Sequence, residues 1–204
     1  MGDEKTMALR EIRDEVMELE TSPLYIYRQE HGYVPVIGQG DHNATLVLVG
    51  EAPGEQEAQT GVPFSGRAGE LLDQLLERVE IDREEIYITN VLKDRPPDNR
   101  TPKADEISLY GPFLIRQIEV IDPKVISPMG KVATEFLFMH YQLQDELGPM
   151  KELHGRKFRV QSLFGEVLLV PIYHPAAVLH NARVRESLEH DFEILKTALE
   201  RVSG

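Results

Sequence analysis

The chain of 204 residues contains no cysteine. It therefore has no disulfide, no thiolate zinc site, no thiol nucleophile and no iron–sulfur cluster held by cysteines. Positive charge is also scarce, because 22 lysines and arginines stand against 35 aspartates and glutamates, a formal net charge of −13. A chain this acidic is not an obvious nucleic-acid binder, so any binding of DNA requires a local basic surface.

Long apolar runs are missing as well. No run in the sequence reaches the length of a bilayer span, and the first residues, Met1 to Glu4, carry no basic and apolar signal segment. We therefore expect a soluble, cytoplasmic monomer with no membrane partner. With 41% hydrophobic and 28% charged residues, the composition is that of an ordinary globular protein. The length suits one domain that spans residues 1–204.

Four continuous apolar runs are typical of strands that are buried on both faces, and they occupy residues 44–50, 86–92, 124–129 and 166–172. Segments with helical periodicity alternate with them, at residues 5–20, 71–79, 107–121, 131–138 and 188–202. The pattern predicts a three-layer α/β/α sandwich with a central four-stranded parallel sheet. Residues 156–161 are predicted to pair with the last run as a hairpin, and residues 21–43 form a polar, glycine-rich stretch.

Polar residues follow each predicted strand. Glu51 comes after the first run, Asn90 lies in the second, Gly130 follows the third and His174 follows the fourth. Because ligands bind at the carboxyl ends of the strands in such sheets, these residues are expected to meet at one rim and form a site. Each of them also has a purely structural interpretation, as a turn, a cap or a core residue, when it is considered alone.

The loop 93–103 differs in composition from the rest of the chain. It carries four basic residues against two acidic ones, within a segment that prolines stiffen. We expect its basic side chains to contact phosphate groups, and these are Lys93, Arg95, Arg100 and Lys103. A solvated loop is the alternative. The glycine-rich turn at 50–54 matches neither a P-loop nor a dinucleotide-binding fingerprint, which argues against nucleoside triphosphates and nicotinamide cofactors.

In order along the chain, these motifs resemble those of the family 4 uracil-DNA glycosylases, within the wider uracil-DNA glycosylase superfamily. The matching segments are GEAPGE at 50–55, TGVPFSGRAGELL at 60–72, IYITNVLKDRPPDNRTP at 86–102, PKVI at 123–126 and YHPA at 173–176. They cover nearly the whole chain. The resemblance implies a uracil-DNA glycosylase-like fold and the excision of uracil from DNA after the base is flipped out of the duplex.

The resemblance also implies a role for each matching residue. Phe64 stacks on the flipped uracil, and the amide of Asn90 reads its edge, in a site to which Gly50 and Ala52 also belong. His174 donates a hydrogen bond to O2 as charge develops on the leaving base. Glu51 and Glu57 match acidic positions, and Glu51 is the better candidate for orienting water or supporting the sugar cation. The apolar run after His174 resembles a wedge loop, with Val178 or Leu179 as the inserted side chain.

Two departures from the family pattern stand out. Members of family 4 normally hold a four-iron, four-sulfur cluster through four cysteines, and this chain carries other residues at those positions: Leu19, Ser22, Asp94 and Tyr110. None can replace a thiolate, so the cluster is expected to be absent and no cofactor or metal is predicted. Instead, Asp94 is predicted to accept hydrogen bonds from Ser22, Tyr110 or both, while Leu19 packs in the emptied volume. The alternative is that Asp94 points into water between Lys93 and Arg95. The second departure is Ala58, where many relatives carry an acid.

Three functions remain open from the sequence. The first is an active, cluster-free uracil-DNA glycosylase, favoured by Glu51, Phe64, Asn90 and His174. The second is a weakly active or inactive DNA-binding relative, favoured by the net charge and the loss of the cluster. The third is a small-molecule N-glycosidase or nucleotide-binding enzyme, which the basic loop and the wedge-like run 176–180 disfavour.

Overall fold

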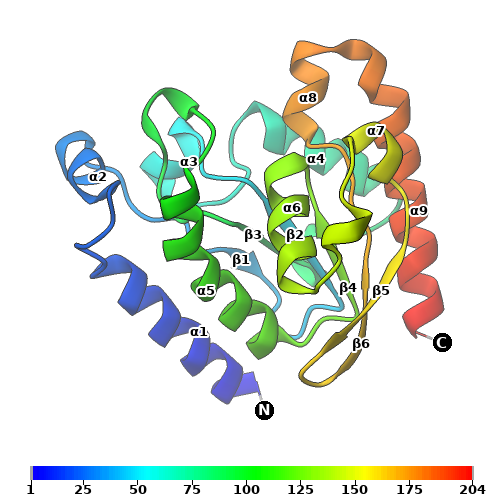
Figure 1. Cartoon of the computed structure of the whole chain (residues 1–204), viewed down its shortest axis with the longest axis horizontal. Helices are drawn as coiled ribbons and strands as arrows, with labels where there is room; N and C mark the ends of the chain where they lie inside the picture. Colours follow the sequence, from blue (N-terminus) through cyan, green and yellow to red (C-terminus); the bar gives the residue numbers. More distant parts are fainter. Residues whose placement is uncertain (1, 204) are drawn as a thin grey trace.

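The computed structural model describes residues 2–203, which form a mixed sheet between two layers of helices (Figure 1). The six strands found in this range are β1 (Gln39–Gly40), β2 (Leu46–Gly50), β3 (Tyr87–Asn90), β4 (Val125–Pro128), β5 (Phe158–Ser162) and β6 (Gly165–Leu169). Their order across the sheet is β1-β3-β2-β4-β6-β5. The pairs β3-β2, β2-β4 and β4-β6 are parallel, whereas β1 and β5 pair antiparallel at the two edges.

The predicted fold class is therefore confirmed, with one addition. The four central parallel strands are those expected, and β5 pairs with β6 as the predicted hairpin, in the register Val160 to Val167. The sequence pattern did not reveal β1, because a two-residue edge strand leaves no apolar run to detect.

The helices alternate with the strands as the periodicity predicted. The longer ones are α1 (Gly2–Met17), α4 (Arg67–Arg78), α5 (Ala104–Ile121), α6 (Lys131–His140) and α9 (Arg185–Ser203). Shorter α-helices are α2 (Tyr25–His31), α3 (Glu55–Thr60), α7 (Met150–Leu153) and α8 (Pro175–His180). Helix α2 lies in the stretch 21–43, which shows no extended apolar stripe.

The side chains of β2 show how the layers are divided. Val47 and Val49 face a core formed with α1, α5 and α6, whereas Leu46 and Leu48 face a core formed with α4 and α9. All five residues of β2 are buried, as the continuous apolar run predicted. Because successive side chains of a strand point to opposite faces, β2 contributes apolar side chains to both cores. A strand that is apolar on both faces belongs in the interior of the sheet, where β2 lies.

No helix within residues 2–203 is long and apolar enough to cross a membrane.

Candidate active site

A cavity of about 640 Å³ lies at the carboxyl ends of the parallel strands. It is on the side of the molecule where α3, the start of α4 and α8 gather in Figure 1. Three of the four residues that the sequence analysis placed at one rim, Glu51, Asn90 and His174, line it together with Phe64. The fourth, Gly130, does not line the cavity but lies against His174, where an added Cβ atom would stand 3.1 Å from the His174 Cβ. The predicted meeting of strand ends is therefore observed.

Gly50 makes this arrangement possible. It is the last residue of β2 and lies beside Asn90 in the parallel register. A Cβ atom at position 50 would stand 2.2 Å from the Asn90 Oδ1 atom and 2.9 Å from the Phe64 ring. Any side chain there would displace both groups from the cavity, so the glycine allows the amide and the ring to approach each other.

The loop before α4 fixes the Phe64 ring. Phe64 has a positive φ of 52°, and its carbonyl oxygen lies 1.7 Å from where a Cβ atom of Gly69 would stand. The Arg83 guanidinium donates to the Pro63 carbonyl at 2.9 Å, and Glu57 Oε1 accepts from the backbone N–H of Gly66 at 3.0 Å. Glu57, a predicted catalytic acid, thus lines the cavity while it holds this loop.

The Asn90 side chain is available to a ligand. The residue is 2% exposed, yet no group within residues 2–203 forms a hydrogen bond with its side-chain amide. Its amide atoms do not belong to the buried polar atoms that lack a partner, so they face the open cavity and can pair with something that enters it. An amide offers one acceptor and two donors, which suits the edge of a base.

His174 has a defined protonation state. It is the N-cap of α8, and its Nδ1 atom accepts a hydrogen bond from the backbone N–H of Ala176 at 3.1 Å. Because Nδ1 is the acceptor, the proton of the neutral ring is on Nε2. Burial lowers the pKa of His174 to about 4, so the ring is neutral at pH 7. Its plane is tilted 30° from that of Phe64, with 5.5 Å between the ring centroids.

Glu51 is the carboxylate of the cavity best suited to act as a base. It is half-buried, and no described residue donates a hydrogen bond to its carboxylate. Burial raises the pKa of Glu51 above its usual value. A carboxylate without protein donors, in contact with an open cavity, can accept a proton from a water molecule.

Comparison with known proteins agrees with this geometry. The family model described as the uracil DNA glycosylase superfamily matches residues 37–198. The chain belongs to this superfamily. A type-4 uracil-DNA glycosylase of Archaeoglobus fulgidus is 40% identical over 91% of this chain and 90% of its own length. Type-4 enzymes of Saccharolobus solfataricus and Thermotoga maritima are 40% and 34% identical, over 92% and 93% of this chain and 85% and 97% of their own lengths. The resemblance to family 4 is confirmed.

The basic loop of this uracil-DNA glycosylase superfamily member differs from the prediction. Lys93 is fully buried, and its ammonium group donates to Thr89, Gln117 and the carbonyl of Asn90 at 2.5–2.8 Å. The prediction that Lys93 contacts phosphate is therefore wrong. The apolar pattern around it could not reveal this, because lysine in a proline-rich loop normally extends into solvent.

The other basic side chains of the loop differ in their exposure and in their partners. Arg95 is largely buried and donates to the hydroxyl group of Tyr33 at 2.7 Å, so it has little freedom to reach phosphate. Arg100 pairs with Glu106 at 2.5 Å, whereas Lys103 is exposed. Arg67, Lys103 and Arg183 are exposed, and none of the three forms an ion pair with a residue in the described part of the chain. Arg67 also lines the cavity.

The predicted wedge residues are part of the short helix α8. Val178 is half-buried and packs against the core on the α4 side of the sheet, whereas Leu179 is 42% exposed. Of the two, Leu179 is therefore the side chain that remains free to enter a duplex. Ala176 and Ala177 of the same helix line the cavity.

The positions that match the family's cluster ligands do not fit an iron–sulfur cluster. The Tyr110 hydroxyl group donates to Asp94 Oδ2 at 2.5 Å and lies 2.7 Å from the Ser22 hydroxyl group, as predicted for Asp94 and Tyr110. Leu19 packs against the neighbouring core. These side chains satisfy one another and offer no thiolate, so no chemistry is derived from such a group.

Arg28 is the partner that the sequence analysis missed. Its guanidinium donates to both oxygens of Asp94 at 3.3 and 3.2 Å and to the carbonyls of Val16 and Met17 at the end of α1. The side chains of Arg28 and Asp94 are 4% and 1% exposed. Arg28 lies in the stretch 21–43, where nothing in the sequence pattern distinguishes it from a surface arginine.

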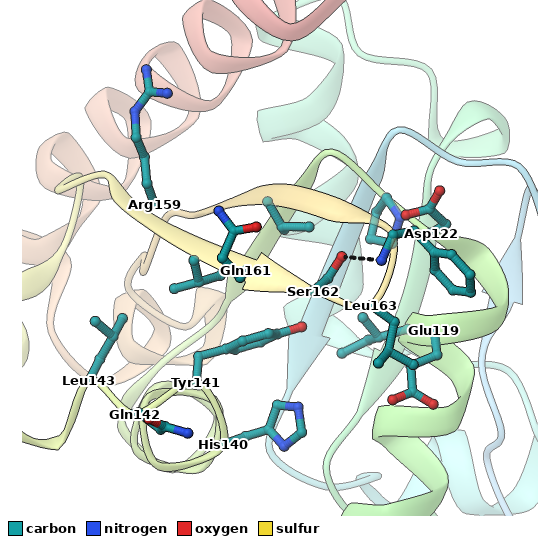
Figure 2. Close-up of a pocket in the computed structure, with 15 residues that line it drawn as sticks. Glu119, Asp122, His140, Tyr141, Gln142, Leu143, Arg159, Gln161, Ser162 and Leu163 are labelled. Carbon is teal, nitrogen blue, oxygen red and sulfur yellow. Dashed lines mark hydrogen bonds between the residues drawn. The ribbon is translucent and has the colours of Figure 1, made fainter.

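A second cavity, of about 510 Å³, lies between the ends of α5 and α6 and the β5-β6 hairpin. Figure 2 shows the Tyr141 ring below Ser162 of the hairpin, with His140 and Glu119 nearby. None of the residues predicted for the site lines this cavity, and the described residues contain no group of three or more acidic, histidine or cysteine side chains that could hold a metal ion.

Proposed function

We propose that this protein is a uracil-DNA glycosylase, which hydrolyses the N-glycosidic bond of uracil in DNA and leaves an abasic site. The observation that carries the proposal is the Asn90 amide, which lines one cavity with the Phe64 ring and the His174 imidazole. The type-4 relatives support the same activity.

Recognition requires the base to leave the stack, because a base inside the duplex cannot reach the side chains that line the cavity. In the cavity, the Phe64 ring stacks on the uracil, and the Asn90 amide donates to O4 and accepts from N3–H. Cytosine presents a donor at position 4 and an acceptor at N3, which leaves the amide and the base edge unpaired. A site that depends on such hydrogen bonds rejects the analogue that cannot form them.

Bond cleavage leaves negative charge on uracil O2. The proton on Nε2 of neutral His174 can donate a hydrogen bond to this oxygen, while Nδ1 is held by Ala176. A preorganised donor of this kind stabilises the transition state without a change in protonation. Glu51, in its ionised form, orients the attacking water and supports the positive charge on the sugar. Every step uses side chains of this chain.

We further propose that the protein acts without an iron–sulfur cluster, as a cytoplasmic monomer on uracil-containing DNA. The hydrogen-bonded side chains of Ser22, Asp94 and Tyr110 support the first part, because they occupy the matching positions and bind one another. The retained Glu51, Phe64, Asn90 and His174 disfavour an inactive DNA-binding relative.

The test is a cleavage assay. A labelled oligonucleotide with one uracil is incubated with the protein in the presence of a metal chelator and then treated with alkali, which breaks the strand at abasic sites. We expect cleavage at the uracil position, and none in matched oligonucleotides with cytosine or thymine. The double variant Glu51→Gln/Asn90→Ala is the control for contaminating enzymes. If the folded protein in excess produces no more abasic sites than this variant, the proposal is wrong.

A further inference from the structure

Helix α2 and Tyr33, two residues after its end, carry a cluster of three aromatic rings. The centroids of Tyr27 and His31 are 4.1 Å apart, those of His31 and Tyr33 are 5.3 Å apart and stacked, and those of Tyr27 and Tyr33 are 6.0 Å apart. His31 is exposed, and the two tyrosines are half-buried. We call these three residues the aromatic cluster.

The Arg95 guanidinium contacts both tyrosines of the aromatic cluster. Arg95 donates to the Tyr33 hydroxyl group at 2.7 Å, and its guanidinium lies 5.4 Å from the centroid of the Tyr33 ring. The Tyr27 hydroxyl group is 3.5 Å from the same nitrogen. Arginine beside an aromatic ring strengthens its interaction with a π system that stacks on it.

The aromatic cluster is connected to the rim of the cavity. The Tyr33 hydroxyl group lies 3.3 Å from Glu55 Oε1, and Arg95 donates to Asn99 Oδ1 at 2.8 Å. Both Glu55 and Asn99 line the cavity. In Figure 1, α2 lies beyond α3 at the same end of the molecule as the cavity. Tyr33 of the aromatic cluster therefore contacts a residue that lines the cavity, where the flipped base would enter.

The buried side chain of Arg28 anchors α2 to the rest of the protein. Arg28, one residue after Tyr27, is buried and joins α2 to Asp94 and to the end of α1. The aromatic cluster is thus presented on a held helix turn, although α2 itself is only seven residues long. Rings held in this way lose little conformational entropy when a flat ligand binds to them.

We propose that the aromatic cluster is a stacking platform for an unpaired base of the DNA strand that flanks the flipped uridine. This inference rests on the proposed function. The exposed Glu30 and the carboxylate of Glu55 leave little net positive charge around the rings, so base stacking, rather than phosphate contact, is the interaction that this surface supports. The partner is single-stranded DNA, or the unpaired part of a distorted duplex.

The variant that tests the platform is His31→Ala, because the side chain is exposed and its removal leaves the core intact. Binding is measured with a single-stranded oligonucleotide that contains one uracil, and excision is followed in parallel. We expect His31→Ala to weaken binding by about fivefold or more, the effect of losing about 1 kcal/mol or more of stacking. His31→Phe keeps a ring and should retain affinity. The matched control is Phe164→Ala, which removes an exposed ring on the β5-β6 hairpin, 63% exposed.

The decisive measurement combines protein and DNA changes. Each of the three bases on either side of the uracil is replaced in turn by an abasic spacer, and binding to wild type and His31→Ala is compared. A platform predicts one position at which the spacer weakens binding to wild type but not to His31→Ala, as expected for two groups that contact each other. If the two losses add at every position, the platform is refuted even though uracil is excised. If coupling is found without excision, the platform stands and the proposed function fails.

Discussion

The ammonium group of Lys93 donates a hydrogen bond of 2.8 Å to the backbone carbonyl of Asn90, the residue whose amide lines the cavity. The same nitrogen donates to the Thr89 hydroxyl group at 2.7 Å and to Gln117 Oε1 at 2.5 Å. The Ile37 carbonyl, at 3.4 Å, is a fourth oxygen acceptor around this nitrogen. Burial lowers the pKa of Lys93, whereas this set of acceptors favours the ammonium form, which has three donors and no acceptor. This lysine therefore joins the end of β3 to α5 from inside the protein.

Lys93→Met removes these donors and keeps the length of the side chain. We expect kcat for uracil excision to fall by about tenfold, because the end of β3 loses the group that holds Asn90, and buried acceptors are left unpaired at a cost of about 1–3 kcal/mol each. Steady-state kinetics and thermal unfolding measure the two effects. Lys103→Met, in the same loop but exposed, is the matched control and should change neither. Unchanged kcat in Lys93→Met would contradict this account.

Asn90→Ala tests recognition of the base. The substitution removes both edge contacts together, so we expect single-turnover excision of uracil to slow by about a hundredfold, the loss seen when one well-placed transition-state donor is removed. Alanine is smaller than asparagine and does not collide with Gly50, so the fold around the cavity should not change. Circular dichroism and thermal unfolding can verify this. His174→Ala should lose activity to a similar degree. Nearly full activity in either variant would remove that residue from the mechanism.

The pH dependence separates Glu51 from His174. Burial raises the pKa of Glu51 and lowers that of His174 to about 4, so on acidification Glu51 loses its charge before His174 gains one. We expect the acidic limb of kcat/KM to follow the protonation of Glu51, at a pH above 4.5, and to disappear in Glu51→Gln. In His174→Gln the limb should remain in the residual activity. A limb that vanishes only in the histidine variant would reverse the two assignments.

His174 also affects stability. Its pKa in the folded protein, about 4, is below the ordinary value of 6.5, so the unfolded chain binds a proton first as the pH falls. The free energy of unfolding should therefore decrease as the pH is lowered from about 6.5 toward 4, and the part due to His174 should be absent in His174→Gln. Urea unfolding of both proteins at several pH values measures the difference.

Binding of DNA should depend on salt through cations that are free to reach phosphate. We expect these to include Arg67, Lys103 and Arg183, which are exposed, and of which Arg67 lines the cavity. Each charge removed should flatten the slope of log affinity against log salt concentration by about 1. Replacing Lys157, which is exposed and does not line the cavity, provides the control. If the triple variant keeps the wild-type slope, these residues do not contact the backbone of DNA.

The central strands and long helices could be predicted because their buried faces produce a regular spacing of apolar residues along the sequence. Val47 and Leu48 face different cores and both are apolar, which only a strand covered on two faces requires. The rim followed from the rule that strand ends converge, so Glu51, Asn90 and His174 were found without coordinates. The roles of these residues came from the resemblance to a family, since each has a structural interpretation by itself.

Burial of polar side chains could not be predicted in the same way. Lys93 and Arg28 are both enclosed by the protein, yet their neighbours in the sequence are those of surface loops. Their partners are distant in the sequence: Gln117 for Lys93, and Asp94 for Arg28. Hydrogen bonds that join segments far apart in the chain leave no local period, so only the assembled fold reveals them.

The network of Arg28, Asp94, Tyr110 and Ser22 should be a major source of stability. Tyr110→Phe removes a hydrogen bond to a carboxylate, and we expect the free energy of unfolding to fall by about 1.5–3 kcal/mol. Asp94→Asn leaves the Arg28 guanidinium buried without its counter-charge, which should cost about 3–5 kcal/mol. Burial and the neighbouring Asp94 raise the pKa of the Tyr110 phenol, so it stays a donor over the accessible pH range. Chemical denaturation of each variant measures these losses.

The double variant Tyr110→Phe/Asp94→Asn distinguishes a network from two separate contacts. Because the Tyr110 hydroxyl group donates to Asp94, both substitutions act on the same hydrogen bond: Tyr110→Phe removes its donor and Asp94→Asn removes the charge of its acceptor. The double variant should therefore be more stable than the sum of the two losses implies. Thr101→Ala, an exposed position in the adjoining loop, should be neutral. Strict additivity, or an Asp94→Asn variant as stable as wild type, would mean that α1, α2, the loop after β3 and α5 are held together by apolar packing alone. In that case Leu19 and its core neighbours, rather than these polar side chains, would hold these segments together in place of a cluster bound by cysteines.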